Sequence, residues 1–235
     1  MDPRATAATQ ALLRRWREQL PSDGRLGWKI GLNDPAVQAR LGLSGSLVGT
    51  LTRRSWLRGR EPLPLDAGAE PFAEPEIAVY LAADLPGGAS AGEALAAIGG
   101  IGPALEVLDM RAAEPDLEAI VRRNFFHAAA VLPEAPVRGG ASLAGIGVRL
   151  TRNGEELRRV AELPDLADVV KLVADTLAAH GERLCAGDRI LSGGMTPVVR
   201  IRPGDSVDAE FAGLGRLGVA LDPGEVPALR ALQHS

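Results

Sequence analysis

The last third of the chain consists of short apolar runs of strand length, joined by turns that contain glycine and proline. An earlier run, 74–81, alternates with the period of two that is typical of a strand. Helical periodicity is limited to a few segments, and strands and helices do not alternate regularly as they do in a doubly wound sheet. The pattern therefore predicts an α+β fold: a mixed β-sandwich or roll with a few flanking helices.

The expected elements follow from periodicity, capping residues and turns. The clearest helix begins after Asp165, which can cap its start, and ends at Gly181. Further helices are expected at 9–20, 35–41, 90–98 and 116–123, and strands at 26–32, 74–81, 103–110, 128–132, 147–152, 155–161, 188–192, 198–201, 206–211 and 217–221. We expect a single domain over 1–235, with an N-terminal helical segment to about residue 24, a β-rich catalytic body over 25–222 and a short C-terminal tail.

Composition and charge argue against two classes of partner. Hydrophobic residues make up 46% and charged residues 24% of the chain, which is typical of a globular protein. The net charge is -4, and no run of basic residues is large enough to follow a phosphate backbone. The apolar stretches are shorter than the roughly 20 residues of a membrane-spanning helix, and the N-terminus resembles a charged helix more than a signal peptide. We expect a cytoplasmic protein without nucleic acid or membrane partners.

The chain offers oxygen rather than sulfur or imidazole as metal ligands. Cys185 is its only cysteine and fits a buried structural thiol, and no closely spaced histidine pair exists. Lysine is also scarce, because only Lys29 and Lys171 are lysines among 26 basic residues. A partly desolvated lysine can release a proton near neutral pH whereas arginine cannot, so either lysine could serve in proton transfer.

Three glutamates suggest a metal site. Glu74 and Glu76 are two apart in an expected strand, so their carboxylates lie on the same face, and Pro75 predicts a sheet edge or a bulge there. Glu106 is embedded in an apolar run, where a lone carboxylate is costly unless a positive group compensates it. A shared Mg²⁺ or Mn²⁺ ion would explain all three. The alternative is a pair of solvated glutamates, with Glu106 paired to an arginine.

Lys29, Thr196 and His127 are further candidates, each with an ordinary alternative. Lys29 lies in a glycine-flanked strand and could exchange protons, or it could be a strand-edge lysine with its amine in water. Thr196 ends a Gly-Gly loop that could face an anionic group, or that could be a plain turn. His127 could contact a substrate, or it could pack against Phe125 or Phe126.

Taken together, several motifs resemble the fumarylacetoacetate hydrolase superfamily, in particular its 2-oxopent-4-enoate hydratases and 2-oxo-3-hexenedioate decarboxylases. The motifs are Gly-Trp-Lys-Ile-Gly-Leu at 27–32, Glu-Pro-Glu at 74–76, Ala-Leu-Glu-Val at 104–107, and the stretch from Ala-Gly-Asp at 186–188 through Thr-Pro at 196–197 to Pro-Gly-Asp at 203–205. The resemblance spans roughly 9–221 and implies this family's fold, a homo-oligomer and a small 2-oxo acid as substrate. It further implies Lys29 as the catalytic lysine and the three glutamates as ligands of Mg²⁺ or Mn²⁺. The residues expected to contact substrate are Gly31, Asn124, His127 and Thr196.

The sequence departs from the hydratase pattern at two places. Leu47 stands where hydratases tend to carry an acidic residue, and Phe125, Phe126 and His127 are bulkier than the residues usual after the asparagine. The expected function is a metal-dependent, hydratase-like lyase acting on a small 2-hydroxy-2,4-dienoate. The alternatives are a decarboxylase of the 2-oxo-3-hexenedioate type, an acylpyruvate hydrolase and a 2-oxo acid binding protein that has lost catalysis.

Overall fold

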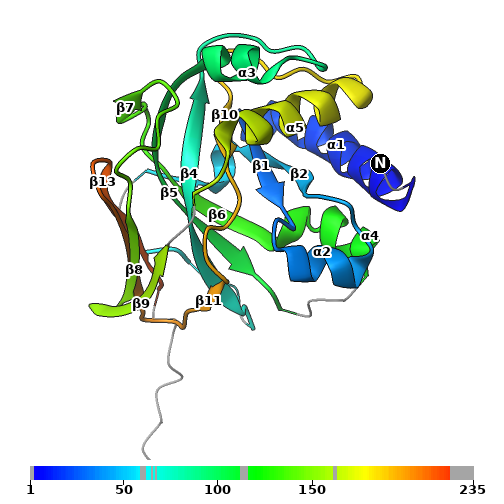
Figure 1. Cartoon of the computed structure of the whole chain (residues 1–235). Coiled ribbons are helices and arrows are strands. Elements are labelled where there is room, and N and C mark those ends of the chain that lie inside the picture. The colour runs from blue at the N-terminus through cyan, green and yellow to red at the C-terminus, as the bar shows by residue number, and fades with distance from the viewer. Residues whose placement is uncertain are drawn as a thin grey trace, which may run out of the picture.

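A curled nine-stranded sheet lies at the centre of the molecule (Figure 1). The computed structural model describes residues 3–58, 62–64, 66, 68–111, 116–160 and 163–222. The strands of this sheet are β1 (Arg25–Gly31), β2 (Leu47–Thr52), β3 (Trp56–Leu57), β4 (Pro71–Leu81), β5 (Ile98–Asp109), β6 (His127–Val131), β7 (Arg138–Gly139), β10 (Arg189–Leu191) and β11 (Val199–Arg200). Their main order is β2-β1-β10-β4-β5-β6-β3, with β11 added beside β4 and β7 beside β5. The long β4–β5 pair is antiparallel and supplies the centre of the sheet.

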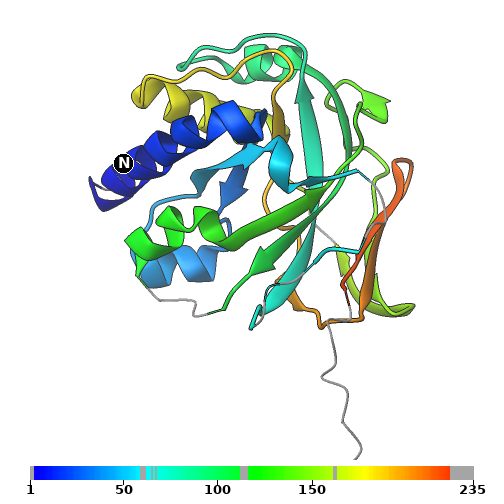
Figure 2. The ribbon, with the colours of Figure 1, turned by 180° about the vertical axis from the view of Figure 1, so that it is seen from behind.

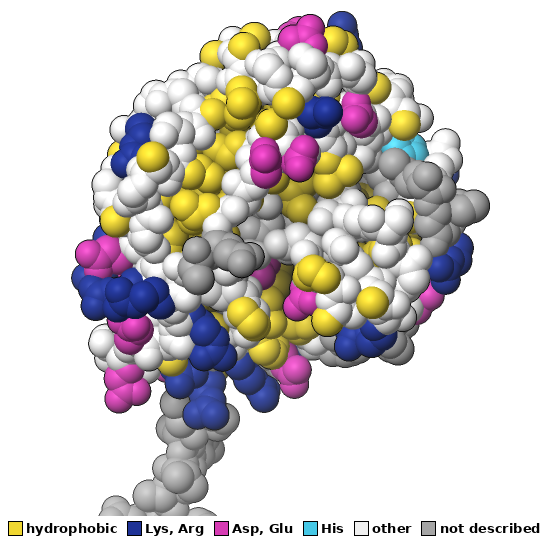
Figure 3. Space-filling model, in the orientation of Figure 1, with side chains coloured by type: hydrophobic (Ala, Val, Ile, Leu, Met, Phe, Trp, Pro, Cys, Tyr) yellow, Lys and Arg dark blue, Asp and Glu magenta, His cyan; other side chains and the backbone are white. Residues whose placement is uncertain are grey.

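A second, four-stranded antiparallel sheet packs against β5 in the order β13-β12-β8-β9. Its strands are β8 (Val148–Arg152), β9 (Glu155–Val160), β12 (Ser206–Phe211) and β13 (Gly215–Ala220). Alternate side chains such as Leu150 and Phe211 are buried, whereas several outward ones are charged and form ion pairs, as in Arg216 with Asp208 at 2.8 Å. In Figure 3 dark blue basic side chains gather in the lower left, where Figure 1 shows this sheet, with acidic side chains among them.

The helices gather at the end of the large sheet that lies away from the small sheet, as both ribbon views show (Figures 1 and 2). They are α1 (Pro3–Asp23), α2 (Pro35–Leu41), α3 (Ala91–Ala97), α4 (Leu117–Arg122) and α5 (Leu166–Ala179), and short 3₁₀ turns η1 (Arg53–Ser55) and η2 (Asn124–Phe126) precede β3 and β6. Asp165 caps α5 as expected, and Ser90 with Glu93 forms a capping box on α3. None of the described helices is long and apolar enough to cross a bilayer.

Strand alternation gives the large sheet two different faces. One face buries Ile77 and Val107 in a core that also includes α5 and the small sheet. The other face carries a smaller apolar cluster that includes Ala78 and Leu191. The expected polar site lies on this second face, because Glu74 and Glu76 precede Ala78 at intervals of two.

The expected α+β class is confirmed, while several boundaries differ. Helix α1 continues through Pro21 to Asp23, and β5 begins at Ile98, five residues before the expected strand. Cys185 is half-buried rather than buried. The expected C-terminal tail after 222, and the expected end of the hairpin at 161, lie outside the described residues.

The expectation that Pro75 marks an edge strand or a bulge is wrong. Strand β4 has β5 on one side and both β10 and β11 on the other, and its register with β5 is continuous through Pro75. The missing proline N–H is tolerated because β10 and β11 leave a gap between them. There the Met195 N–H donates to the Pro75 carbonyl at 3.1 Å. This gap lets the 193–196 loop reach the glutamates.

Candidate functional site

The three expected glutamates converge in the structure. Glu74 lies directly opposite Glu106 in the β4–β5 register, and Glu76 follows on the same face of β4. One carboxylate oxygen from each residue lies within 4.8 Å of those of the other two. Glu76 and Glu106 are fully buried, and Glu74 is half-buried. The register of one strand pair therefore brings together three acidic groups separated by up to 32 residues of sequence.

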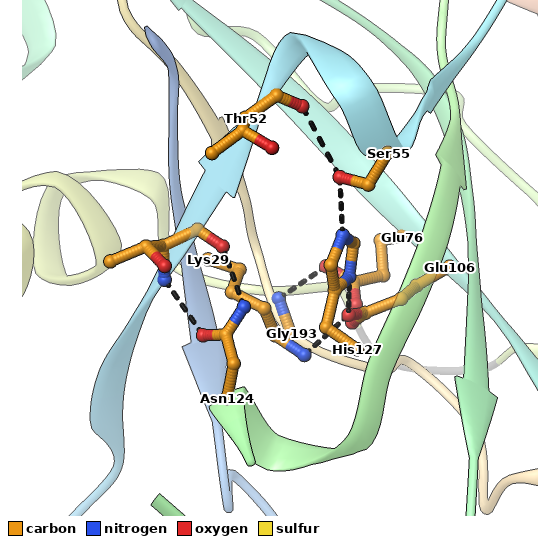
Figure 4. A network of polar contacts seen from close by, with 9 residues as sticks. Lys29, Thr52, Ser55, Glu76, Glu106, Asn124, His127 and Gly193 are labelled. Atoms are coloured by element: carbon orange, nitrogen blue, oxygen red, sulfur yellow. Dashed lines mark hydrogen bonds and ion pairs between the residues drawn. The ribbon is translucent and has the colours of Figure 1, made fainter. Parts of the chain in front are cut away.

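Hydrogen bonds occupy one oxygen of Glu106 and one of Glu76 (Figure 4). Lys29 Nζ and His127 Nδ1, the latter at 2.6 Å, both contact Glu106 Oε1. The Gly193 N–H donates to Glu76 Oε2 at 2.7 Å. Glu76 Oε1 and Glu106 Oε2 are buried and have no hydrogen-bond partner among the described residues. Glu106 is thus paired to a lysine, and the expected alternative of an arginine partner is wrong.

The three carboxylates have very different proton affinities. Burial raises the pKa of Glu74 to about 8, with a contribution from the negative charge of Glu106, while Lys29 opposes the shift. Burial and the charges of Glu106 and Glu74 raise the pKa of Glu76 well above its usual value. Burial also acts on Glu106, but Lys29 and then His127 outweigh it and lower its pKa to about 2. The protein therefore stabilises one of the three negative charges.

These residues fit a divalent metal ion. Two buried carboxylate oxygens have no partner among the described residues, and an unsatisfied buried acceptor is costly. The donor set consists only of carboxylate oxygens, which Mg²⁺ and Mn²⁺ prefer. A cation here would balance the charge that Lys29 leaves uncompensated.

Lys29 is buried beside the glutamates. Its side chain is 2% exposed, which rules out the alternative of a strand-edge lysine with its amine in water. Gly49 lies opposite Lys29 on β2, and a Cβ at position 49 would come within 2.8 Å of Lys29 Cγ. The glycine therefore leaves room for the lysine side chain to cross the sheet surface toward Glu106.

The 193–196 loop approaches the glutamates closely through its backbone. A Cβ on Gly194 would lie 2.0 Å from Glu74 Oε2, so no larger residue fits there without moving that carboxylate. Thr196 Oγ1 is buried without a hydrogen-bond partner among the described residues. The loop is therefore more than a plain turn, while the assignment of Thr196 as a substrate contact stays a prediction.

Asn124 and Gly31 lie near Lys29, and both make close contacts within the protein. The Asn124 side-chain amide donates to the Thr50 carbonyl at 2.8 Å and accepts the Thr50 N–H at 2.9 Å. A Cβ on Gly31 would lie 2.6 Å from the Phe125 ring. Asn124, Phe125 and Phe126 all have left-handed backbones, with φ of 53°, 56° and 65°, a strained conformation that is concentrated at functional sites. Asn124 and Gly31 therefore help to place Phe125, and their roles in substrate binding stay predictions.

His127 contacts the carboxylate cluster, which the sequence did not indicate. Its Nδ1 is bonded to Glu106, and its Nε2 lies 2.8 Å from Ser55 Oγ. His127 also lines a cavity of about 420 Å³ together with Arg123 and Phe126, and its contact with a substrate stays a prediction. Ser55 belongs to no motif, and only the pairing of β3 with β6 brings it to His127.

Comparisons with known proteins agree with this arrangement. Residues 44–221 match the family model for the fumarylacetoacetate (FAA) hydrolase C-terminal domain. A 4-oxalocrotonate decarboxylase from Pseudomonas sp. is 32% identical over 203 residues, which cover 82% of this chain and 77% of the relative. A 2-keto-4-pentenoate hydratase from Paraburkholderia xenovorans is 30% identical over 213 residues, 88% of this chain and 79% of the relative.

Solved structures show the same fold. The 4-oxalocrotonate decarboxylase from Pseudomonas putida G7, complexed with magnesium and adipate, aligns with a TM-score of 0.78 at 28% identity over 88% of this chain and 82% of that chain. The fumarylpyruvate hydrolase from Pseudomonas aeruginosa, in complex with Mn²⁺ and pyruvate, aligns with a TM-score of 0.66 over 84% of this chain and 89% of that chain. At 16% identity the second comparison bears on the fold alone.

Proposed function

The chain belongs to the fumarylacetoacetate hydrolase family, and we propose that it is a metal-dependent, hydratase-like lyase acting on a small 2-hydroxy-2,4-dienoate. Its relatives at 30% to 32% identity include hydratase and decarboxylase enzymes. The observation that carries the proposal is that Glu76 and Glu106, beside Glu74 and the buried Lys29, each have a buried oxygen with no partner in the described part of the chain.

In this proposal Glu74, Glu76 and Glu106 would hold Mg²⁺ or Mn²⁺. The bound ion would supply positive charge that stabilises the negative charge developing on the 2-oxygen of the substrate. Support comes from the all-oxygen donor set and from the magnesium in the related decarboxylase structure.

Lys29 is the residue proposed to move a proton. Its Nζ lies at Glu106 and 5.8 Å from the centre of the Phe125 ring, so it is held between a carboxylate and an aromatic wall. From this position Lys29 would exchange a proton between Nζ and a carbon of the dienoate. Phe125 would keep water away from the amine, and the 193–196 loop would orient the substrate carboxylate.

A decarboxylase acting on a 2-oxo-3-hexenedioate is the second candidate, because Leu47 stands where hydratases tend to carry an acidic residue. Leu47 is buried in an apolar cluster with Phe125, so this side of the site lacks the carboxylate that hydratases tend to carry there. Loss of carbon dioxide uses the same electron sink but requires no added water. The related decarboxylase structure, at 28% identity, supports this alternative.

Parallel assays separate the candidates. The purified protein with Mg²⁺ or Mn²⁺ is given 2-hydroxypenta-2,4-dienoate, whose absorbance is followed, and 2-oxohex-3-enedioate, whose released carbon dioxide is measured. Consumption of the dienoate that stops in EDTA supports the hydratase, and metal-dependent carbon dioxide release alone supports the decarboxylase. Metal-dependent binding of oxalate without turnover of either compound would contradict both and favour a binding protein.

Three broader expectations remain proposals. A single domain over the whole chain, a homo-oligomer and a cytoplasmic location are consistent with a small-molecule enzyme of this family. Light scattering coupled to size-exclusion chromatography tests the assembly directly, since a monomer at all concentrations would contradict it.

A further inference from the structure

We propose that His127 is a positioning residue of the metal site: together with Lys29 it holds Glu106 Oε1, so that Oε2 is the oxygen presented to the metal. The inference rests on the proposed function, because it assumes that Glu106 is a metal ligand. It concerns His127 and its support Ser55, which the sequence motifs do not include.

The contacts of Glu106 separate its two oxygens. Oε1 receives both Lys29 Nζ and His127 Nδ1, the latter at 2.6 Å, while the buried Oε2 has no partner among the described residues. A carboxylate paired with a lysine has no hydrogen to give, so the proton of this contact belongs to His127 Nδ1. A carboxylate anchored through one oxygen can rotate less and offers the other oxygen in a fixed direction.

The imidazole is itself held from its other side. Its Nε2 lies 2.8 Å from Ser55 Oγ, and with the proton on Nδ1 it accepts the hydrogen of the Ser55 hydroxyl, which can otherwise donate to the Thr52 carbonyl at 3.2 Å. The His127 side chain is 5% exposed, so water has little access to compete for either nitrogen. Figure 4 shows the resulting line of contacts from Thr52 through Ser55 and His127 to Glu106. The contact with Ser55 therefore holds the ring from the side opposite Glu106.

One oxygen of Glu76 is likewise anchored, in this case by the backbone. The Gly193 N–H holds its Oε2, and its Oε1 is the second buried oxygen without a partner among the described residues. The two carboxylates therefore follow one rule, in which the protein anchors one oxygen and leaves the other. Glu106 is held in part by a side chain, His127, which can be replaced, whereas Glu76 is held by a backbone N–H. The rule can therefore be tested at Glu106.

The matched variants are His127→Leu and His127→Asn. Leucine fills much of the space of the ring but has no N–H, whereas the asparagine amide can place an N–H close to the position of Nδ1. The readout is the dissociation constant of Mn²⁺ without substrate, measured by calorimetry, with circular dichroism as the check on folding. We expect His127→Leu to weaken Mn²⁺ binding about 10- to 100-fold, and His127→Asn to stay within roughly threefold of the parent protein.

Other results overturn the inference in distinguishable ways. A folded His127→Leu protein that binds Mn²⁺ as tightly as the parent contradicts the role of His127 alone. A parent protein that does not bind Mn²⁺ contradicts the proposed function and this inference with it.

A measurement on the parent protein covers the case in which His127→Leu does not fold. The chain has 3 histidines, so the ¹⁵N signals of His127 can be assigned by comparison with variants of the other two. We expect Nδ1 to carry the proton, and an unprotonated Nδ1 would contradict the proposed contact.

Discussion

Strand β1 contributes to two charge clusters that are built in opposite ways. Near its start, Arg25 Nε donates to Asp188 Oδ1 at 2.6 Å, and Asp188 Oδ2 accepts from Trp28 Nε1 and from the Cys185 N–H, both at 3.0 Å. Further along, Lys29 enters a cluster of three carboxylates in which two oxygens have no partner among the described residues. Both carboxylate oxygens at Asp188 have partners within the protein, whereas the glutamate cluster is incomplete, because two of its oxygens have none among the described residues.

The difference separates a structural ion pair from a ligand site. At Asp188 one carboxylate faces one guanidinium, and the guanidinium also lies 5.6 Å from the centre of the Trp16 ring and 5.1 Å from that of Trp28. Burial lowers the pKa of Arg25, but Asp188 outweighs it and raises that pKa overall. At the glutamates the shifts of Glu74 and Glu76 instead resist ionisation. The uncompensated cluster is therefore the one that we propose as the functional site.

Replacing Glu106 should have the largest effect on activity. Glu106→Gln removes the negative charge of the proposed ligand, whose Oε2 has no partner among the described residues, while a similar side-chain shape remains. We expect metal-dependent turnover to fall by about three orders of magnitude, since the stabilising cation is no longer held. Steady-state assays over a range of Mg²⁺ concentrations measure this, and full activity at saturating metal would contradict the assignment of Glu106.

Replacing Asp188 should affect stability instead. Asp188→Asn leaves Arg25 without its counter-charge, and we expect a loss of about 2 kcal/mol in the free energy of unfolding, reduced from the fully buried case because Arg25 is partly exposed. Urea unfolding checks this value. Turnover per folded molecule should remain, and a loss of Mn²⁺ binding in this variant would undermine the contrast between the two clusters.

The sequence indicated the incomplete cluster better than the complete one. Glu74, Glu76 and Glu106 were identifiable because two shared a strand face and the third interrupted an apolar run, and Lys29 stood out because lysine is scarce. Asp188 drew no attention as a partner of Arg25, since 163 residues separate the two. Local patterns report which residues are unusual, whereas partners distant in sequence depend on the sheet order.

Backbone conformation was the least predictable part of the site. No glycine occurs at 124–126, yet all three residues are left-handed, because packing of Phe125 against Gly31 and Gly49 overrides their local preferences. Pro75 gave a misleading signal, because an edge strand and a gap between two neighbouring strands both tolerate a missing N–H. The α+β class was predictable because it depends on periodicity along the whole chain.

The glutamate cluster should also make stability and metal binding depend on pH. Glu74 and Glu76 bind protons more tightly in the folded protein than in the unfolded chain, so metal-free stability should fall as the pH rises from about 4.5 to about 8. Metal competes with these protons, so the increase in Tm on adding Mn²⁺ should grow over the same range. Thermal unfolding from pH 5 to pH 8, with and without Mn²⁺, measures both effects. An increase in Tm that does not change with pH would argue against binding through these carboxylates.

A smaller effect is expected from the loop that approaches the cluster. Gly194→Ala places a Cβ where Glu74 Oε2 now lies, so that carboxylate must move, and we expect Mn²⁺ binding to weaken by about tenfold. Gly187→Ala, near Asp188, is the matched control, because nothing lies within 4 Å of its added Cβ. Its positive φ of 86° should cost stability without changing metal affinity. Equal Mn²⁺ affinities in the two variants would show that the 193–196 loop does not contribute to the metal site.

The most direct test of the account is a crystal structure of the protein soaked with Mn²⁺ and oxalate, with anomalous scattering used to locate the metal. We expect one strong peak bound by an oxygen of each of Glu74, Glu76 and Glu106, with oxalate completing the coordination and the Arg25–Asp188 pair unchanged. A metal bound elsewhere, or a Glu106 Oε2 that does not bind the metal, would contradict the claim that the incomplete charge cluster is the catalytic centre.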